Sequence, residues 1–399
     1  MSPHDMMGVM EDTSVPRGRR EALVLLILLT IAIAAWAAVG ALVNRFHSWQ
    51  RVLARRMDQR GQLAMKAGQP GLAIDFFRSS LSFNRDDPAA LLSLAESLIA
   101  ENRLEEAESY LDNLWERQPQ DGTTNLELAR LATHRRQVTE VLRYYHNAIY
   151  GIWRSDPVQN RIAARFELVN FLLEQNAVAQ AKSELIAMEP GLPANSPLHT
   201  KVGQLFLNIS DYRSAENEFL QALKLERNDR VAAAGAGNAA FHLGHYRTAI
   251  LYLDAAVAKD PSDQQSQKML ESGRLVLDAD PFLRNLSAPE RQERILKAYR
   301  AAANRLETCV KTINRNTTRA MPSNQTAAAP TALAGLSARE RQLGSEIHPR
   351  LLVKNPELPA AAMSFAFEVE EQTAQICGEP SGIDQALLLI GRNREGVER

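Results

Sequence analysis

The 399-residue sequence carries 46 Lys and Arg against 47 Asp and Glu, a formal net charge of −1. A chain so nearly neutral has no overall field that would attract it to nucleic acid, so a nucleic-acid partner is not expected. Apolar residues make up 45% and aromatic residues only 6%. With its abundant alanine, this balance is typical of a helical chain that buries a core.

The first predicted element is the uncharged segment 22–43, which follows a polar tail at residues 1–21. At about 1.5 Å of rise per residue, a helix of this length can cross a hydrocarbon core of roughly 30 Å. We predict a single transmembrane helix. A cleaved signal peptide is the alternative, but the apolar core of a signal peptide is usually shorter, about 7 to 15 residues.

The arginines around this segment bear on its orientation. Their numbers before and after it are nearly balanced: Arg17, Arg19 and Arg20 precede it, and Arg45, Arg51, Arg55 and Arg56 follow it. The tight cluster in front is typical of a signal anchor that keeps its amino terminus inside. We therefore expect a single-pass protein of the inner (cytoplasmic) membrane, with the bulk of the chain on the outer, periplasmic side.

Small alanines then recur at intervals of 34 residues, from Ala73 to Ala107 and again from Ala181 through Ala215 to Ala249. Twelve residues before each alanine position stand mostly small side chains, which let two helices cross closely: Gly61, Ala95, Ala129, Val169, Gly203 and Gly237. Four residues after it stand large side chains that fill the neighbouring groove: Phe77, Leu111, Tyr145, Leu185, Phe219 and Leu253.

This pattern resembles the tetratricopeptide repeat, most clearly in GHYRTAILYLDAAVAKDP (residues 244–261) and ISDYRSAENEFLQALKLE (residues 209–226). The resemblance implies an all-α fold in which about six helical hairpins stack into an α-solenoid over residues 54–263. Two units are degenerate: one has Val141 in place of the small alanine, and the next begins six residues late. The extra residues, near 153–157, should lengthen one hairpin end or loosen the stack between the third and fourth units.

Beyond the array, residues 264–313 are predicted to form capping helices, one of them beginning after an N-cap at Ser287. Residues 314–336, rich in Asn, Thr, Ala and Pro, are predicted to be a flexible linker. Residues 337–399 should form a small helical segment that folds back on the array. Cys309 and Cys377 would form a disulfide in an oxidising compartment, although two free thiols explain the sequence equally well.

The sequence contains no pattern of metal ligands, no nucleophile motif and no phosphate loop, so we expect no catalytic residues, no metal, no cofactor and no small-molecule substrate. GAGNAA, residues 235–240, matches a loose dinucleotide fingerprint, but its glycines lie inside a predicted helix. The acidic runs at residues 105–108 and 368–372 are interpreted as solvated helix faces.

In arrays of this family the first helix of each unit lines a concave groove that accepts a peptide or a partner helix, so the resemblance implies protein partners. The ninth position of each unit is polar throughout, a ladder suited to binding a guest backbone: Gln62, Glu96, Arg130, Asn170, Gln204 and Asn238. Solvent-facing helix positions are usually polar, which explains the ladder equally simply. Apolar neighbours, Phe166 and Phe241 among them, would anchor a guest.

The sequence thus predicts a membrane-anchored scaffold that recruits or organises partner proteins through the groove of the array. Such a scaffold would have other proteins or peptides as partners and would reach the membrane through its N-terminal helix. The alternative is a regulatory subunit of a membrane enzyme or of a secretion or envelope machine. An enzyme within residues 337–399 is a weaker third hypothesis, for which the sequence offers no candidate residues.

Overall fold

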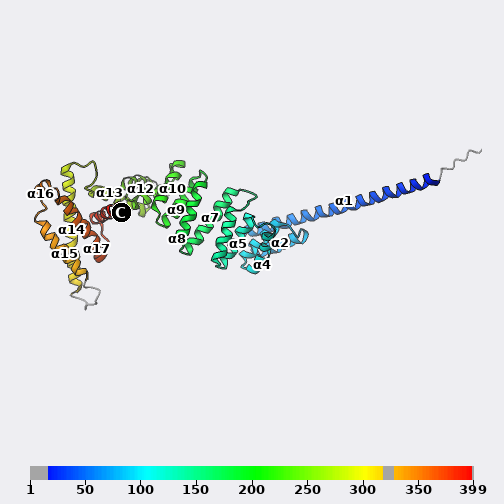
Figure 1. Ribbon diagram of the computed structural model, residues 1–399, viewed down its shortest axis with the longest axis horizontal. Helices are drawn as coiled ribbons and strands as arrows, with labels where there is room; N and C mark the ends of the chain where they lie inside the picture. Colours follow the sequence, from blue (N-terminus) through cyan, green and yellow to red (C-terminus); the bar gives the residue numbers. More distant parts are fainter. Residues whose placement is uncertain (1–16, 318–327, 398–399) are drawn as a thin grey trace, which may run out of the picture. The chain divides into compact units, whose positions relative to one another are not determined.

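The structure is a computed structural model that describes residues 17–317 and 328–397 (Figure 1). Within these residues every regular element is a helix, and one isolated bridge pairs Asp121 with Ile152. The prediction of an all-α solenoid of helical hairpins is confirmed. The chain divides into two compact units, of which unit 1 ends at Gln175 and unit 2 begins at Asn176.

Unit 1 contains three helical hairpins and the first helix of a fourth. Each hairpin joins two helices through a short turn: α1 (Arg17–Lys66) with α2 (Pro70–Phe83), α3 (Pro88–Ala100) with α4 (Leu104–Arg117), and α5 (Gly122–His134) with α6 (Val138–Tyr150). The helix α7 (Pro157–Glu174) packs against α6. Aspartates cap two of the first helices, with Asp87 accepting from Ala89 N and Asp121 from Thr124 N.

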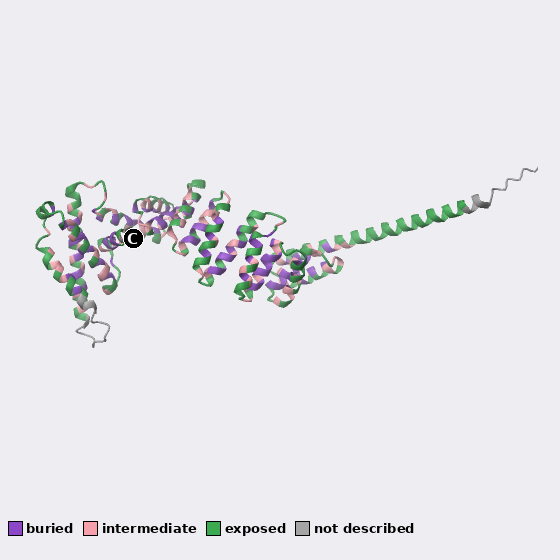
Figure 2. Cartoon of the chain, in the orientation of Figure 1, coloured by how far each residue is buried: buried purple, intermediate pink, exposed green. Residues whose placement is uncertain are grey.

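Helix α1 is unbroken from Arg17 to Lys66, so the apolar segment continues directly into the first helix of the first repeat. Residues 44–53, which the sequence analysis left unassigned, contain neither Gly nor Pro and continue the helix. The apolar part is exposed along its length, and α1 is long and apolar enough to cross a membrane (Figure 2). A signal sequence would meet the same criteria, so the membrane span stays a prediction.

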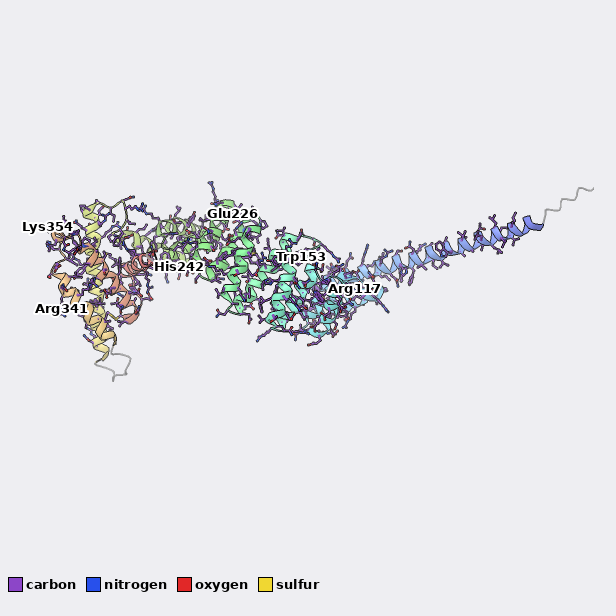
Figure 3. The ribbon with its side chains drawn as sticks, in the orientation of Figure 1. Arg117, Trp153, Glu226, His242, Arg341 and Lys354 are labelled. Carbon is purple, nitrogen blue, oxygen red and sulfur yellow. A yellow bond between two sulfur atoms is a disulfide. The ribbon has the colours of Figure 1, made fainter. Side chains whose placement is uncertain are left out.

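The six extra residues after the third repeat lengthen the following helix. Helix α7 has 18 residues, whereas α3, α5, α9 and α11 have 13 each. The turn before it is packed, since Trp153 Nε1 donates to Ala148 O at 2.9 Å and the indole covers Gly122 (Figure 3). Of the two expected alternatives, the structure therefore shows the lengthened hairpin end, while the turn before α7 is held against α5 and the division between the units falls after α7.

Unit 2 begins with α8 (Val178–Met188) and a short 3-10 turn, Glu189–Gly191. Two complete hairpins and a single closing helix follow: α9 (Ser196–Asn208) with α10 (Tyr212–Leu225), α11 (Arg230–His242) with α12 (Tyr246–Lys259), and then α13 (Gln264–Ala279). Helix α13 packs on α12 and is capped by Asp263, which accepts from Ser266 N at 3.1 Å.

The recurring positions of the repeat pack as their spacing predicts. The five periodic alanines have no exposed surface, and the large residues four positions later are 3% exposed or less. A Cβ atom added at Gly61 would lie 2.6 Å from the Phe77 ring, so only glycine allows that ring so close to the helix. These buried residues line the helices of both units in purple in Figure 2.

The remaining helices of unit 2 are α14 (Ala288–Thr317), α15 (Ala328–Gly344), α16 (Pro349–Lys354), α17 (Leu358–Cys377) and α18 (Gly382–Val397). Ser287 opens α14 with a capping box, since its backbone N donates to Glu290 Oε2 at 2.9 Å. The expected flexible linker at 314–336 is corrected in part. Residues 314–317 and 328–336 are helical, and 318–327 lie outside the described residues.

Helices α14 to α17 form a core of their own around Tyr299, Phe365 and Val369. Cys309 of α14 and Cys377 of α17 are joined by a disulfide, with their Cα atoms 5.8 Å apart. Helix α18 packs against α13 and Tyr246 of α12 through Ala386 and Ile390. Helix α14 also meets the end of α13, where Arg294 donates to Leu277 O at 2.6 Å and to Asp280 O at 2.9 Å. Helix α18 therefore folds back on the end of the array as expected, whereas α15 to α17 pack mainly on α14 and on one another.

Candidate partner-binding face

The ladder residues differ in how far the fold exposes them. Gln62, Asn170 and Gln204 are exposed, whereas Glu96, Arg130 and Asn238 are half-buried. Two of the exposed amides bond within their own helix, Gln62 Nε2 to Asp58 Oδ2 at 3.0 Å and Gln204 Nε2 to Asn208 Oδ1 at 3.2 Å. Such bonds are easily exchanged for bonds to a guest, because both partners already lie at the surface.

Arg130 is the centre of a charged cluster on the first helices of unit 1. Its Nε and one terminal nitrogen donate to the two oxygens of Glu167 on α7, at 3.0 and 2.6 Å, and its other terminal nitrogen donates to Glu127 at 2.5 Å. Tyr145 on α6 adds a hydroxyl donor to Glu167 at 3.2 Å. A planar guanidinium is suited to such bidentate pairing.

The cluster holds more negative than positive charge. Burial raises the pKa of Glu127 to about 7, because Arg130 only partly offsets the loss of solvation and the nearby carboxylates of Glu96 and Glu167 repel it. Burial also raises the pKa of Glu96, against the attraction of Arg130. Three carboxylates therefore surround one guanidinium. We call Glu96, Glu127, Arg130, Tyr145 and Glu167 the Arg130 cluster.

Sequence analysis named two members of the cluster, Glu96 and Arg130, and missed the other three. Glu127 and Glu167 each lie three residues before a ladder position on the same helix, and residues at that spacing share a helix face. That spacing could have indicated that both glutamates lie on the same face as the ladder. The pairing of Arg130 with Glu167 joins neighbouring repeats and had no local signal, because it depends on how α5 and α7 pack.

Comparison with known proteins agrees with the repeat architecture. The family model described as "Tetratricopeptide repeat" matches residues 64–140, which run from the end of α1 into α6. The match covers the hairpin of α3 and α4 and reaches the first residues of α6, so this part of the chain is similar to tetratricopeptide repeats. A search of curated protein sequences finds no match to the chain.

Solved structures similar to the tetratricopeptide array include PilF of Pseudomonas aeruginosa, at 13% identity over 55% of this chain and 97% of that one, with a TM-score of 0.39. PilW, described as a type IV pilus biogenesis factor, has 15% identity over 54% and 98%, with a TM-score of 0.38. The C-terminal part of a repeat protein from Cytophaga hutchinsonii has 12% identity over 59% and 92%, with a TM-score of 0.41. Likeness at this level concerns helical architecture alone.

The two aromatic residues predicted to anchor a guest are used by the tetratricopeptide array itself. Phe166 is only 5% exposed and belongs to the core of unit 1. Phe241 is half-buried, with its ring 5.5 Å from Tyr246 and packed beside the cluster that α13 and α18 form. The surface that a partner could reach on this face is therefore mainly polar.

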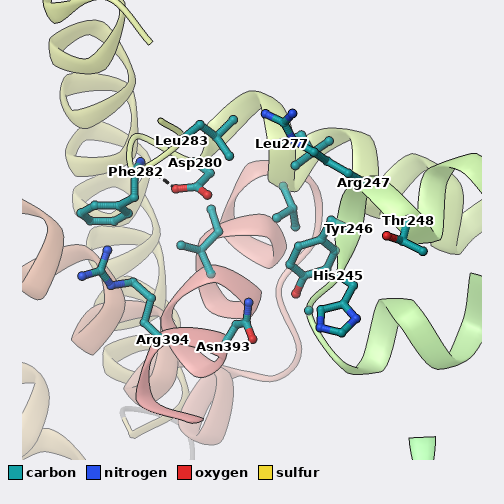
Figure 4. Close-up of a pocket in the computed structure, with 13 residues that line it drawn as sticks. His245, Tyr246, Arg247, Thr248, Leu277, Asp280, Phe282, Leu283, Asn393 and Arg394 are labelled. Carbon is teal, nitrogen blue, oxygen red and sulfur yellow. Dashed lines mark hydrogen bonds between the residues drawn. The ribbon is translucent and has the colours of Figure 1, made fainter. Parts of the chain in front are cut away.

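A pocket that no sequence motif marks lies where the last repeat meets α18 (Figure 4). It encloses about 560 Å³ between apolar walls that include Tyr246, Leu277 and Ile390. At its mouth the Arg394 guanidinium carbon lies 3.7 Å from the centre of the Phe282 ring, and Phe282 N donates to Asp280 Oδ1 at 2.8 Å. Its walls come from distant parts of the chain, so local sequence cannot reveal it.

The glycines of GAGNAA have a packing role. Gly235 and Gly237 lie within α11, where added Cβ atoms would come within 2.3 Å of the Phe219 ring and 2.6 Å of Leu253. A helix interior packed in this way has no free amide groups to bind a pyrophosphate. Among the described residues, no three His, Cys, Asp or Glu side chains are grouped to hold a metal ion.

The interpretation of residues 368–372 as a solvated face is wrong for Glu370. This side chain has no exposed surface, because it lies on the face of α17 that packs against α14. The pKa of Glu370 is raised to about 8, because burial and the Asp384 carboxylate raise it by more than Arg305 lowers it. Sequence alone did not reveal this, since Glu368 and Glu371 beside it do reach solvent.

Proposed function

We propose that the chain is a membrane-anchored scaffold that binds a partner protein on the first-helix face of unit 1. The observation that carries the proposal is the Arg130 cluster, in which three carboxylates share one guanidinium on α3, α5 and α7. Arg130 is 41% exposed and Glu167 32%, so a partner can reach both. A lysine or arginine from the partner would balance the excess negative charge.

Two further features support the membrane part of the proposal. The segment 22–43 of α1 is uncharged and entirely exposed, which in water would leave a long apolar surface uncovered. The disulfide between Cys309 and Cys377 is typical of proteins in an oxidising compartment. Together they favour a span that leaves the array and the C-terminal helices outside the cytosol.

The binding experiment should leave Arg130 intact, because removing it would also strip the buried Glu127 of its cation. Asn170 is a better choice, since it is an exposed ladder residue of α7 next to the cluster. We expect Asn170→Arg to repel a basic partner and to lower its recovery from detergent-solubilised membranes by about tenfold.

The matched control is Asn113→Arg, which makes the same change at an exposed position on α4, a second helix of unit 1. This variant should recover the partner as well as the unmodified chain does. Equal recovery with both variants would show that the first-helix face is not the binding surface.

The anchor is tested by labelling introduced cysteines in intact cells. Gln120→Cys and Asn228→Cys place thiols at exposed turns of units 1 and 2, in a chain from which Cys309 and Cys377 have been removed. A maleimide that cannot cross the inner membrane should label both sites without lysis. Protection until lysis would place the repeats in the cytosol, and a chain released from the membrane would indicate a cleaved signal peptide.

A further inference from the structure

A second surface of unit 2 lies on the second helices of the hairpins, separate from the ladder. Helices α10 and α12 border a groove of about 590 Å³, whose base includes Ala233 of α11. The groove is lined by Leu220, Leu223, Leu251 and Tyr252 between the two helices. We call it the Leu251 groove, because Leu251 is 65% exposed there.

Three cations surround this apolar floor: Lys224, Arg227 and Lys259. Lys259 Nζ donates to Asn228 O at 2.8 Å, and Lys224 Nζ lies 3.4 Å from Gln221 Oε1. None of the three pairs with a carboxylate among the described residues, and the groove lining contains no acidic residue. The rim therefore carries a formal charge of about three positive units at neutral pH.

Two neighbouring cations, on α11 and α13, are paired with carboxylates. Arg230 at the start of α11 pairs with Asp260 at 3.1 Å, and Arg274 on α13 pairs with Asp254 of α12 at 2.8 Å. Acidic residues are thus available nearby but are engaged elsewhere. The Leu251 groove combines an uncovered apolar floor with uncompensated positive charge.

We propose that the Leu251 groove docks an acidic amphipathic helix of a partner protein. Two parallel ridges of side chains with a furrow between them accept a third helix, whose apolar face would cover Leu251 and Tyr252. Carboxylates along the edges of that helix would pair with the three rim cations. The furrow between α10 and α12 runs between two helices, a shape that suits a third helix better than it suits the flat surface of an anionic membrane.

This inference is independent of the proposed function, because it concerns other helices and a partner of opposite charge. A scaffold with both surfaces would hold a basic partner on unit 1 and an acidic one on unit 2. Failure at the Leu251 groove would leave the prediction for Asn170 unaffected.

The test uses the full chain in nanodiscs of zwitterionic lipid and a fluorescent peptide of roughly 18 residues, long enough for five helical turns. The peptide carries Leu on one face and Glu on the other, and a second peptide carries Lys in place of Glu. Fluorescence anisotropy should show saturable binding of the Glu peptide that weakens with added salt, and no binding of the Lys peptide.

Two variants locate the binding. Lys224→Glu/Arg227→Glu should weaken binding of the Glu peptide at least about tenfold by reversing the charge of the rim. Leu251→Asp should weaken it similarly by placing a charge in the apolar floor. Arg213→Glu/Lys268→Glu, an equal charge change at exposed sites of α10 and α13, should leave binding unchanged. Absence of saturable binding, or binding that survives the first double variant, overturns the proposal. The proposal is also overturned if the chain sediments with anionic vesicles but does not bind the Glu peptide.

Discussion

Arg305 Nε lies 3.1 Å from Glu370 Oε2, and the Glu370 side chain has no exposed surface. The same guanidinium donates to Thr373 Oγ1 and to Gly378 O, each at 2.7 Å. It therefore holds the carboxyl end of α17 against α14, one helical turn from the disulfide at Cys309. Because Arg305 is only 16% exposed and Glu370 is buried, water screens these contacts less than it would screen an exposed ion pair.

Arg305→Met should destabilise the C-terminal helices by about 2 kcal/mol, because Thr373 Oγ1 and the Gly378 carbonyl would lose the hydrogen bonds that Arg305 donates to them. Hydrogen exchange of the α14 and α17 amides in the full chain would measure the loss as faster opening. Arg300→Met is the control, since Arg300 lies on the same helix and is exposed. Similar exchange in both variants would mean that the buried pair contributes nothing.

The stability of these helices should also fall as the pH rises. The pKa of Glu370 is about 8 in the folded chain, above its ordinary value of 4.5. Between these two values the unfolded chain releases a proton that the folded chain retains, so stability is greatest below the lower value and declines toward the higher one. Glu370→Gln should flatten this dependence in exchange measured from pH 5 to 8, whereas Glu368→Gln, at an exposed site, should not.

Reduction of the disulfide should loosen the same helices. Cys309 and Cys377 are 68 residues apart, and opening a loop of that length costs about 4 kcal/mol in the chain-entropy model. Dithiothreitol should therefore increase protease cleavage between α14 and α18 in the unmodified chain. The double variant Cys309→Ala/Cys377→Ala should be cleaved equally fast with and without the reductant, and a reductant effect there would point to another target.

Gly235→Ala should destabilise the tetratricopeptide array of unit 2 by about 2 kcal/mol, because the new Cβ would lie 2.3 Å from the buried Phe219 ring. Gly191→Ala is the matched control, since nothing lies within 4 Å of its added Cβ. Thermal unfolding followed by circular dichroism would compare them. Equal midpoints would show that α11 can shift to make room for a methyl group.

Sequence spacing was sufficient for the parts of the fold that depend on local geometry. The two helices of each hairpin cross in the same way, and this crossing recurs every 34 residues. It determines where Ala73, Phe77 and their equivalents in later units lie. The same regularity explains why Gly235 and Gly237 were assigned to packing and not to a nucleotide. Helices within residues 337–399 were also expected, but the first half of α15 lies in the segment that was predicted to be a flexible linker.

The candidate site was less predictable, because it depends on contacts between repeats. The repeat position alone did not distinguish two ladder residues that differ in the structure. Asn170 is exposed, whereas Arg130 is paired with Glu167 of the next repeat. Glu370 was predicted to face solvent because it lies in a run of acidic residues, and the sequence does not indicate which of them faces the core. The absence of a break between the apolar segment and the first repeat was also missed, since each was considered as a separate element.

Because α1 continues without a break from the apolar segment into the first repeat, the rotation of that repeat about the helix axis is fixed relative to the apolar segment. A flexible tether would let the repeat point anywhere, whereas an unbroken helix transmits both axial rotation and axial displacement. One residue inserted among residues 44–53 would turn the repeat by about 100° and move it by about 1.5 Å along the axis, and a whole turn of inserted residues would nearly restore its heading. The number of residues between the apolar segment and the first repeat therefore determines the direction that the surface of the repeat faces. In a series of variants with insertions of increasing length in this stretch, that direction would change periodically, while the distance of the repeat from the apolar segment would increase steadily.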